Sequence, residues 1–480
     1  MNRKFLVLVL LILTGISFTY PQVLYGNVDV KGVWQGSLKV SGTELRIVFK
    51  ISMEGDALTA TMDSPDQGAT DIPVDEVIVE GDNLTLKVKS IGGVYEGKLQ
   101  EDGSEVVGQW KQSGFSFPLA LERVEKVPLV SRPQEPKKPY PYDEEEVFYE
   151  NENADIKLAG TLTMPHTGGS FPAVILISGS GPQDRNETVF GHRPFLILSD
   201  YLTRRGIAVL RVDDRGVGES TGSSSESTSE DFADDVLAGI GYLKTRKEID
   251  PEKIGLIGHS EGGIIAPMVA SESPDVAFIL LMAGTGLTGE RILYLQSELI
   301  GKAEGATEEA IEDNRREQER IFSILKEEKD NTVAEKEIRK ILEDALANLS
   351  EEEKQKMNLS PEELKEKIDT QVKQLLSPWL RFFLTYDPKV ALKKVKCPVL
   401  AINGEKDLQV PPKENLSAIR ETLKAGGNND YIVKELPGLN HLFQTAESGA
   451  ISEYAKIEET ISPTALKLVG DWILKRTELR

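Results

Sequence analysis

The chain has 480 residues, of which 39% are hydrophobic, so two domains are expected, and a third if an insertion folds on itself. Its formal net charge of -22 repels phosphate groups at long range, which excludes nucleic acids and anionic membrane surfaces as expected partners. The charge carries no information about the fold.

The N-terminal segment, residues 1–26, has the pattern of an export signal. Arg3 and Lys4 form a basic tip before an apolar run. We therefore expect an exported protein, periplasmic, extracellular or associated with the cell envelope, whose segment is a signal peptide or an uncleaved membrane anchor. The chain has one cysteine, Cys397, which excludes an intramolecular disulfide and favours a buried structural thiol.

Residues 27–126 predict a small all-β domain. Apolar and polar residues alternate in short runs such as 45–51 and 84–88, and turn residues separate the runs. About eight strands would close as a barrel or sandwich. Trp34 and Trp110 near its two ends are expected in its core, with ligand stacking as the alternative.

A proline-rich linker, 127–144, follows and should run extended. From 145 to 480 the pattern changes to apolar β-rich runs separated by helical segments, after a hairpin formed by 146–149 and 156–164. Strands buried on both faces and alternating with helices predict an α/β fold with a mostly parallel, doubly wound sheet. The expected strands are 173–177, 207–212, 254–257, 277–282 and 399–402.

One interval, about 287–394, interrupts the alternation. It is rich in Glu, Lys and Arg and contains no convincing strand. Residues 311–326, 332–349 and 361–376 each read as amphipathic helices. We expect a helical cap inserted between two strands of the sheet.

The stretch 254–263 reads IGLIGHSEGG and places Ser260 between closely spaced glycines, directly after an apolar run. Gly258, Ser260 and Gly262 match the G-x-S-x-G nucleophile elbow, in which a strand turns sharply into a helix. Side chains at the two glycines would collide with the neighbouring chain. The helix after Ser260 would point its positive end at the site, so the Glu261 amide is expected to face a developing oxyanion.

Two competing patterns fail on their context. Ser220 lies in a second G-x-S-x-G match, 218–222, but a serine-rich loop follows it in place of a helix. Residues 284–289 imitate a dinucleotide fingerprint, yet no second strand ending in an acid follows. No cluster at metal-ligand spacing is evident. We expect no cofactor and no metal.

A serine nucleophile needs a base, and the chain offers four histidines: His166, His192, His259 and His441. His259 adjoins Ser260 and would point away from it at an elbow. His441 follows a strand-like run, in a loop free to reach the elbow, and is the predicted base.

The acid that orients His441 should follow the strand 399–402 at the carboxyl edge of the sheet. Asp407 is the preferred residue and Glu405 is the fallback. The chain order Ser260, Asp407, His441 is the order that this fold uses.

The loop 178–182 should supply the second oxyanion donor, because its glycines let backbone amides approach a substrate closely. The Ser180 amide is the expected donor and Gly181 the next candidate. Gly179 and His259 are expected to contact the substrate. The nearby residues 184–186 would line the pocket or form a structural ion pair.

Together, residues 178–184, 214–220, 258–263, 404–407 and 440–441 resemble the α/β-hydrolase family, over about 145–480. The resemblance is closest to exported bacterial carboxylesterases of the serine-aminopeptidase-like or dienelactone-hydrolase-like branch that carry an N-terminal β domain. It implies hydrolysis of small esters with short acyl chains. Ser178 departs from the family pattern, where many relatives have histidine.

Three functions remain open at this point. A carboxylesterase acting through Ser260, His441 and Asp407 is favoured. A serine aminopeptidase or amidase is the second enzyme reading, because a carboxylate-rich cap could hold an amino terminus. The third is a lipid- or glycan-binding protein whose hydrolase fold is idle. The sequence leaves the oligomeric state open.

Overall fold

The computed structural model describes residues 30–478 except 41–42, 56, 66–68, 101, 113–114, 126–130 and 348–360. The expected export segment, 1–26, lies outside the described residues. Among the helices that the structure describes, none is long and apolar enough to cross a membrane.

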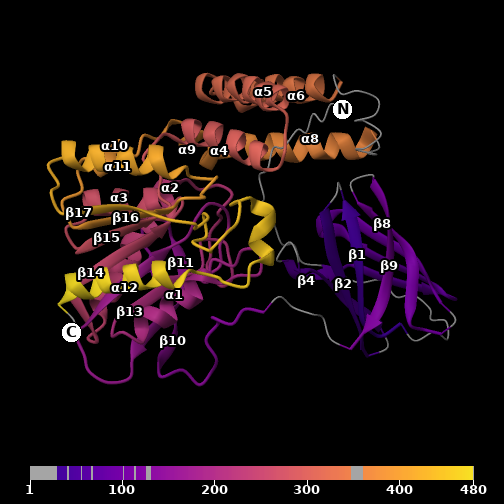
Figure 1. Cartoon of the computed structure of the whole chain (residues 1–480), viewed down its shortest axis with the longest axis horizontal. Helices are drawn as coiled ribbons and strands as arrows, with labels where there is room; N and C mark the ends of the chain where they lie inside the picture. The colour runs from indigo at the N-terminus through magenta and orange to yellow at the C-terminus, as the bar shows by residue number, and fades with distance from the viewer. Residues whose placement is uncertain are drawn as a thin grey trace.

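The N-terminal domain is one nine-stranded antiparallel sheet that closes almost into a barrel (Figure 1). We expected about eight strands. Its interior is filled by side chains, and Trp34, Trp110 and Tyr95 are fully buried. This confirms the core role of both tryptophans and leaves no support for ligand stacking on them. The strands are β1 Gly32–Val40, β2 Thr43–Glu54, β3 Ala57–Ser64, β4 Ala69–Val74, β5 Glu76–Glu80, β6 Asn83–Val88, β7 Gly93–Leu99, β8 Glu105–Gln112 and β9 Phe115–Val124, with a 3-10 turn η2 Lys89–Ile91.

The second sheet has eight strands in the order β10-β11-β13-β12-β14-β15-β16-β17. The predicted hairpin is present, and the six strands from β12 to β17 run parallel. Side chains on both faces of the inner strands β12, β14, β15 and β16 are mostly apolar and buried, as in other parallel sheets. Cys397 is half-buried, two residues before β16. The strands are β10 Tyr142–Asn151, β11 Ile156–Pro165, β12 Phe171–Ile177, β13 Ala208–Val212, β14 Ile249–His259, β15 Phe278–Met282, β16 Val399–Gly404 and β17 Tyr431–Leu436.

Helices cover both faces of this sheet (Figure 1). One apolar core packs α1 and α12 against one face, and a second packs α2, α3, α10 and α11 against the other. This is the predicted doubly wound arrangement, an α/β-hydrolase fold. The helices are α1 Pro194–Thr203, α2 Ser229–Thr245, α3 Gly262–Glu272, α10 Lys389–Leu392, α11 Pro412–Ala425 and α12 Pro463–Thr477, with a 3-10 turn η3 Ile451–Lys456.

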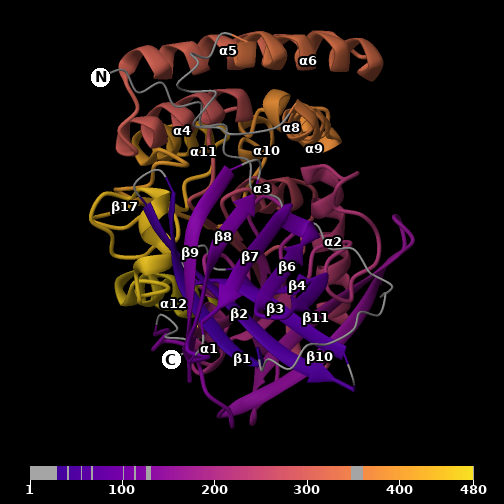
Figure 2. The ribbon, with the colours of Figure 1, turned by 90° about the vertical axis from the view of Figure 1, so that its right-hand side faces the viewer.

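The predicted cap is helical and lies between β15 and β16, over the α3 side of the sheet (Figures 1 and 2). Its helices bury an apolar core of their own, built around Phe322, Ile338 and Leu380. The cap consists of α4 Gly289–Ala303, α5 Glu308–Glu327, α6 Asn331–Ala347, α8 Pro361–Leu375 and α9 Pro378–Thr385.

The described part of the linker is attached to the α/β domain through Arg132. Its guanidinium donates hydrogen bonds to the carbonyl oxygens of Ile457 at 2.6 Å and Ala455 at 3.0 Å. The linker ends earlier than predicted, since β10 begins at Tyr142.

Candidate active site

Ser260 lies on the sharp turn between β14 and α3. Its φ of 52° is in the left-handed region that a side chain rarely adopts. A Cβ atom at Gly258 would lie 1.9 Å from the Gly262 carbonyl oxygen, and one at Gly262 would lie 2.2 Å from that of Ile177. Both glycines are therefore required by the close approach of backbone, as the sequence predicts. The strain at Ser260 is of the kind that folds retain at functional sites.

His441 and Asp407 form a buried pair. His441 Nδ1 lies 2.8 Å from Asp407 Oδ2, and the two side chains are 5% and 0% exposed. The other carboxylate oxygen, Oδ1, accepts hydrogen bonds from the amides of Gln409 and Val410 at 2.8 Å each. Glu405, the fallback acid, instead accepts from the Gly438 amide. Of the two candidate acids, Asp407 is the one that contacts His441.

The three predicted residues come together at one edge of the sheet. Ser260 follows β14, Asp407 follows β16 and His441 follows β17, and the carboxyl ends of these parallel strands share that edge. Among the described residues, no hydrogen bond joins Ser260 Oγ to His441. Such contacts are often long before substrate binds.

The loop 178–182 approaches the serine closely. A Cβ atom built on Gly179 would lie 3.3 Å from the Ser260 Cβ. The Gly179 amide is already occupied, because it donates to Glu187 Oε1 at 2.7 Å. Within the described chain, the structure shows no hydrogen bond from the amides of Ser180 and Glu261. These two amides are the ones predicted as oxyanion donors.

The sequence reasoning missed Glu187, a buried acid in the loop before α1. Glu187 Oε1 lies 2.8 Å from His259 Nδ1, and His259 Nε2 lies 3.1 Å from the His441 carbonyl oxygen. His259 is thus buried with both ring nitrogens engaged, which gives it an internal role in place of the predicted substrate contact. Nothing local in the sequence marks Glu187, since an acid in a loop is ordinarily solvated.

Two further carboxyl groups are buried near the loop without a lysine or arginine partner among the described contacts. Desolvation raises the pKa of Asp214 well above its ordinary value, although it accepts hydrogen bonds from Ser178 Oγ and the Gln183 amide. Desolvation also raises the pKa of Glu261, whose Oε1 accepts from Ser229 at 2.6 Å and from Trp379 of the cap at 2.8 Å. The residue after Ser260 therefore also contacts the cap.

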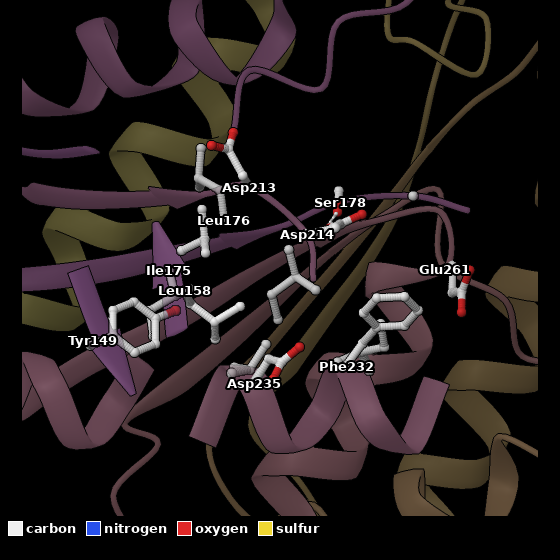
Figure 3. Close-up of a pocket in the computed structure, with 15 residues that line it drawn as sticks. Tyr149, Leu158, Ile175, Leu176, Ser178, Asp213, Asp214, Phe232, Asp235 and Glu261 are labelled. Carbon is white, nitrogen blue, oxygen red and sulfur yellow. Dashed lines mark hydrogen bonds between the residues drawn. The ribbon is translucent and has the colours of Figure 1, made fainter. Parts of the chain in front are cut away.

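A cavity of about 40 Å³ lies next to this region, with Ser178, Asp214 and Glu261 among its lining residues (Figure 3). Its other walls come from strands β10 to β13 and from helices α2 and α3. Neither Ser260 nor His441 lines the cavity, so it adjoins the candidate site without surrounding these two residues.

The remaining motifs have structural roles. The Ser220 hydroxyl is buried, donates to the Asp213 carbonyl oxygen and accepts from the Ala159 amide. Arg185 pairs with Asp213 at 2.7 Å and with Glu146, so this residue of the stretch 184–186 forms a structural ion pair. Over the described ranges, no group of three or more His, Cys, Asp or Glu could hold a metal ion.

Comparisons with known proteins find similarity to peptidases, esterases and hydrolases. A family model for X-Pro dipeptidyl-peptidases of the S15 family matches residues 154–434, more than half of the chain. Esterase EstD of Thermotoga maritima is 24% identical over 342 residues, covering 70% of this chain and 69% of EstD. The putative hydrolase YtaP of Bacillus subtilis is 30% identical over 119 residues, 21% of this chain and 39% of YtaP.

Two solved esterases give weaker matches. A Pyrococcus furiosus esterase, Pf2001, is 18% identical with a TM-score of 0.42, over 73% of this chain and 99% of Pf2001. Est1E from Butyrivibrio proteoclasticus with bound ferulic acid is 17% identical with a TM-score of 0.41, over 69% of this chain and 99% of Est1E. The chain is a hydrolase of the α/β-hydrolase superfamily, and it belongs to the X-Pro dipeptidyl-peptidase (S15) family.

Proposed function

We propose that the protein is a carboxylesterase with Ser260 as nucleophile, His441 as base and Asp407 as the acid that orients the base. The observation that carries the proposal is the 2.8 Å contact between His441 Nδ1 and Asp407 Oδ2, at the same edge of the sheet as the strained Ser260. A carboxylate only accepts hydrogen bonds, so His441 Nδ1 must carry the proton that it donates to Asp407. His441 Nε2 is then free to accept the proton of Ser260.

The reaction follows from these roles. The Ser260 proton moves to His441 Nε2 while Oγ attacks the ester carbonyl, and the amides of Glu261 and Ser180 stabilise the oxyanion. The positive end of α3 adds to that stabilisation. The carbon–oxygen bond then breaks, and the alcohol leaves with the proton from His441. Water, deprotonated by the same histidine, hydrolyses the acyl-enzyme.

A fluorophosphonate probe tests the nucleophile. The wild-type protein should be labelled at Ser260, and Ser260→Ala should lose both labelling and hydrolysis of p-nitrophenyl butyrate. Ser220→Ala is the matched control, because this serine lies in the same sequence pattern but its hydroxyl is engaged internally. Labelling that survives Ser260→Ala, or no labelling of the wild type, would favour an idle hydrolase fold.

We propose short-chain acyl esters as the substrate class, on the strength of the family resemblance. A series of p-nitrophenyl esters of increasing acyl length tests this. The rate should fall beyond butyrate, and faster turnover of long-chain esters would contradict the proposal.

A peptidase is the second candidate, because the matching family is named for X-Pro dipeptidyl-peptidases. Hydrolysis of p-nitrophenyl butyrate should be compared with that of aminoacyl and X-Pro p-nitroanilides. We expect the larger kcat/KM for the ester, and the reverse order would favour the peptidase.

A further inference from the structure

Three loops of the candidate site meet at one buried pair of side chains. Glu187 Oε1 accepts a hydrogen bond of 2.7 Å from the amide of Gly179, in the loop 178–182, here called the oxyanion loop. The same oxygen lies 2.8 Å from His259 Nδ1. His259 belongs to the elbow, and its Nε2 lies 3.1 Å from the carbonyl oxygen of His441. The loop after β17 that carries His441 is here called the base loop. The rings of His259 and His441 are 4.9 Å apart. The pair therefore connects the oxyanion loop, the nucleophile and the base.

The proton inventory of this contact chain is constrained. The His441 carbonyl oxygen can only accept, so His259 Nε2 must carry a proton. When Glu187 is ionised it also only accepts, and then Nδ1 carries a second proton and His259 is an imidazolium. Burial lowers the pKa of His259, but the Glu187 carboxylate raises it, and the net shift is upward.

Glu187 and His259 are buried, and each is the charged partner of the other. The side chains of His259 and Glu187 are 9% and 4% exposed. Glu187 Oε2 has no hydrogen-bond partner in the described part of the chain, so His259 is the group that balances this carboxylate. Glu187 has a φ of 51°, another left-handed residue beside the site, which indicates that its position is imposed by its contacts.

We propose that Glu187 and His259 are positioning residues, which hold two loops in place relative to Ser260. They hold the oxyanion loop through the Gly179 amide and the base loop through the His441 carbonyl oxygen. This inference rests on the proposed function. It assigns an acid–histidine pair that acts behind the residues that would contact the substrate.

Two substitutions of His259 separate its two contacts. The amide nitrogen of glutamine reaches near the place of Nε2, whereas that of asparagine lies near the place of Nδ1. His259→Gln can thus keep the bond to the His441 carbonyl, and His259→Asn loses it. All rates are divided by the fraction of protein whose Ser260 reacts with the fluorophosphonate probe. We expect His259→Asn to lower kcat on p-nitrophenyl butyrate by about 10- to 100-fold, with KM within about threefold, because small displacements of a catalytic group are costly. His259→Gln should retain a kcat about fivefold or more above His259→Asn.

Glu187→Gln gives an independent test. An amide oxygen could accept from both Gly179 and Nδ1, but a neutral His259 would then have no proton for the His441 carbonyl. An amide nitrogen in that place would face the Gly179 donor. Either orientation breaks one contact, so kcat should fall by about 10- to 100-fold and a low-field imidazole proton NMR resonance should disappear.

Asp143→Asn is the matched control, since Asp143 forms an exposed contact of 2.7 Å with His166 Nδ1. It should leave kcat and the low-field resonance unchanged. A wild-type protein without labelled Ser260 would remove the proposed function itself. Labelled Ser260 with equal kcat for both His259 variants, or with wild-type kcat in Glu187→Gln, would overturn only the inference about the pair.

Discussion

The substitution Asp407→Asn tests the proposed triad at its most buried member. The geometry predicts which way the new amide will turn. Asp407 Oδ1 accepts two backbone hydrogen bonds, from Gln409 and Val410, whereas Oδ2 faces one ring nitrogen of His441. The asparagine oxygen should take the place of Oδ1, because an amide nitrogen there would face two donors.

The asparagine NH₂ group then points at His441 Nδ1 and donates to it. This fixes the proton of the imidazole on Nε2, the nitrogen that must accept the proton of Ser260. A wrong tautomer of this kind lowers kcat by about 10,000-fold in serine hydrolases, which corresponds to about 5 kcal/mol of transition-state stabilisation. The fold should survive, since the two backbone hydrogen bonds remain.

The assay is kcat for p-nitrophenyl butyrate, measured with the thermal melting curve of each variant. Glu405→Gln is the control, because Glu405 follows the same strand but accepts from the Gly438 amide. It should stay within about threefold of wild type. If Asp407→Asn kept more than a tenth of the wild-type kcat, the assignment of Asp407 would be refuted.

Three other predictions concern Gly258, His192 and Trp379. Gly258→Ala places a Cβ atom 1.9 Å from the Gly262 carbonyl oxygen and should abolish activity and lower the melting temperature, so an active variant with unchanged melting would contradict the elbow geometry. Burial lowers the pKa of His192 from 6.5 to about 4, so its stabilising contribution is complete above pH 6.5 and is lost as pH falls toward 4. The free energy of unfolding should fall by up to about 3 kcal/mol over that window, which is seen as a lower urea midpoint. The fall should be smaller in His192→Gln. Trp379→Phe removes the donor to Glu261 Oε1 and should cost about 1–2 kcal/mol, seen as a lower urea midpoint with an unchanged circular dichroism spectrum.

The sequence predicted the elements of the catalytic domain well, because each carries a local and periodic signal. Strands buried on both faces are continuous apolar runs, and the cap helices have an apolar stripe at helical spacing. The elbow was predictable for a steric reason, since Gly258 and Gly262 are the residues that the close backbone approach permits. The second G-x-S-x-G match was rejected correctly on context alone, and Ser220 is internal.

The contacts among loops were not predictable. Glu187 lies more than seventy positions before His259 in the sequence, and no spacing rule relates an acid in one loop to a histidine at a strand end. The same limit left Asp407 and Glu405 as alternatives, because both follow β16 and only the path of the loop decides which one meets His441. The β domain also has nine strands and not about eight, since short strands at hairpins are hard to divide by alternation.

Glu261 shows why the cap and the chemistry should not be treated separately. Its backbone amide is a proposed oxyanion donor, while its buried side chain accepts from Ser229 at the start of α2 and from Trp379 in α9. A shift of α9 therefore acts on the same residue whose amide must lie within hydrogen-bonding distance of the oxyanion. Since oxyanion stabilisation depends on the donor being placed beforehand, the packing of the cap contributes to the geometry of the proposed reacting centre.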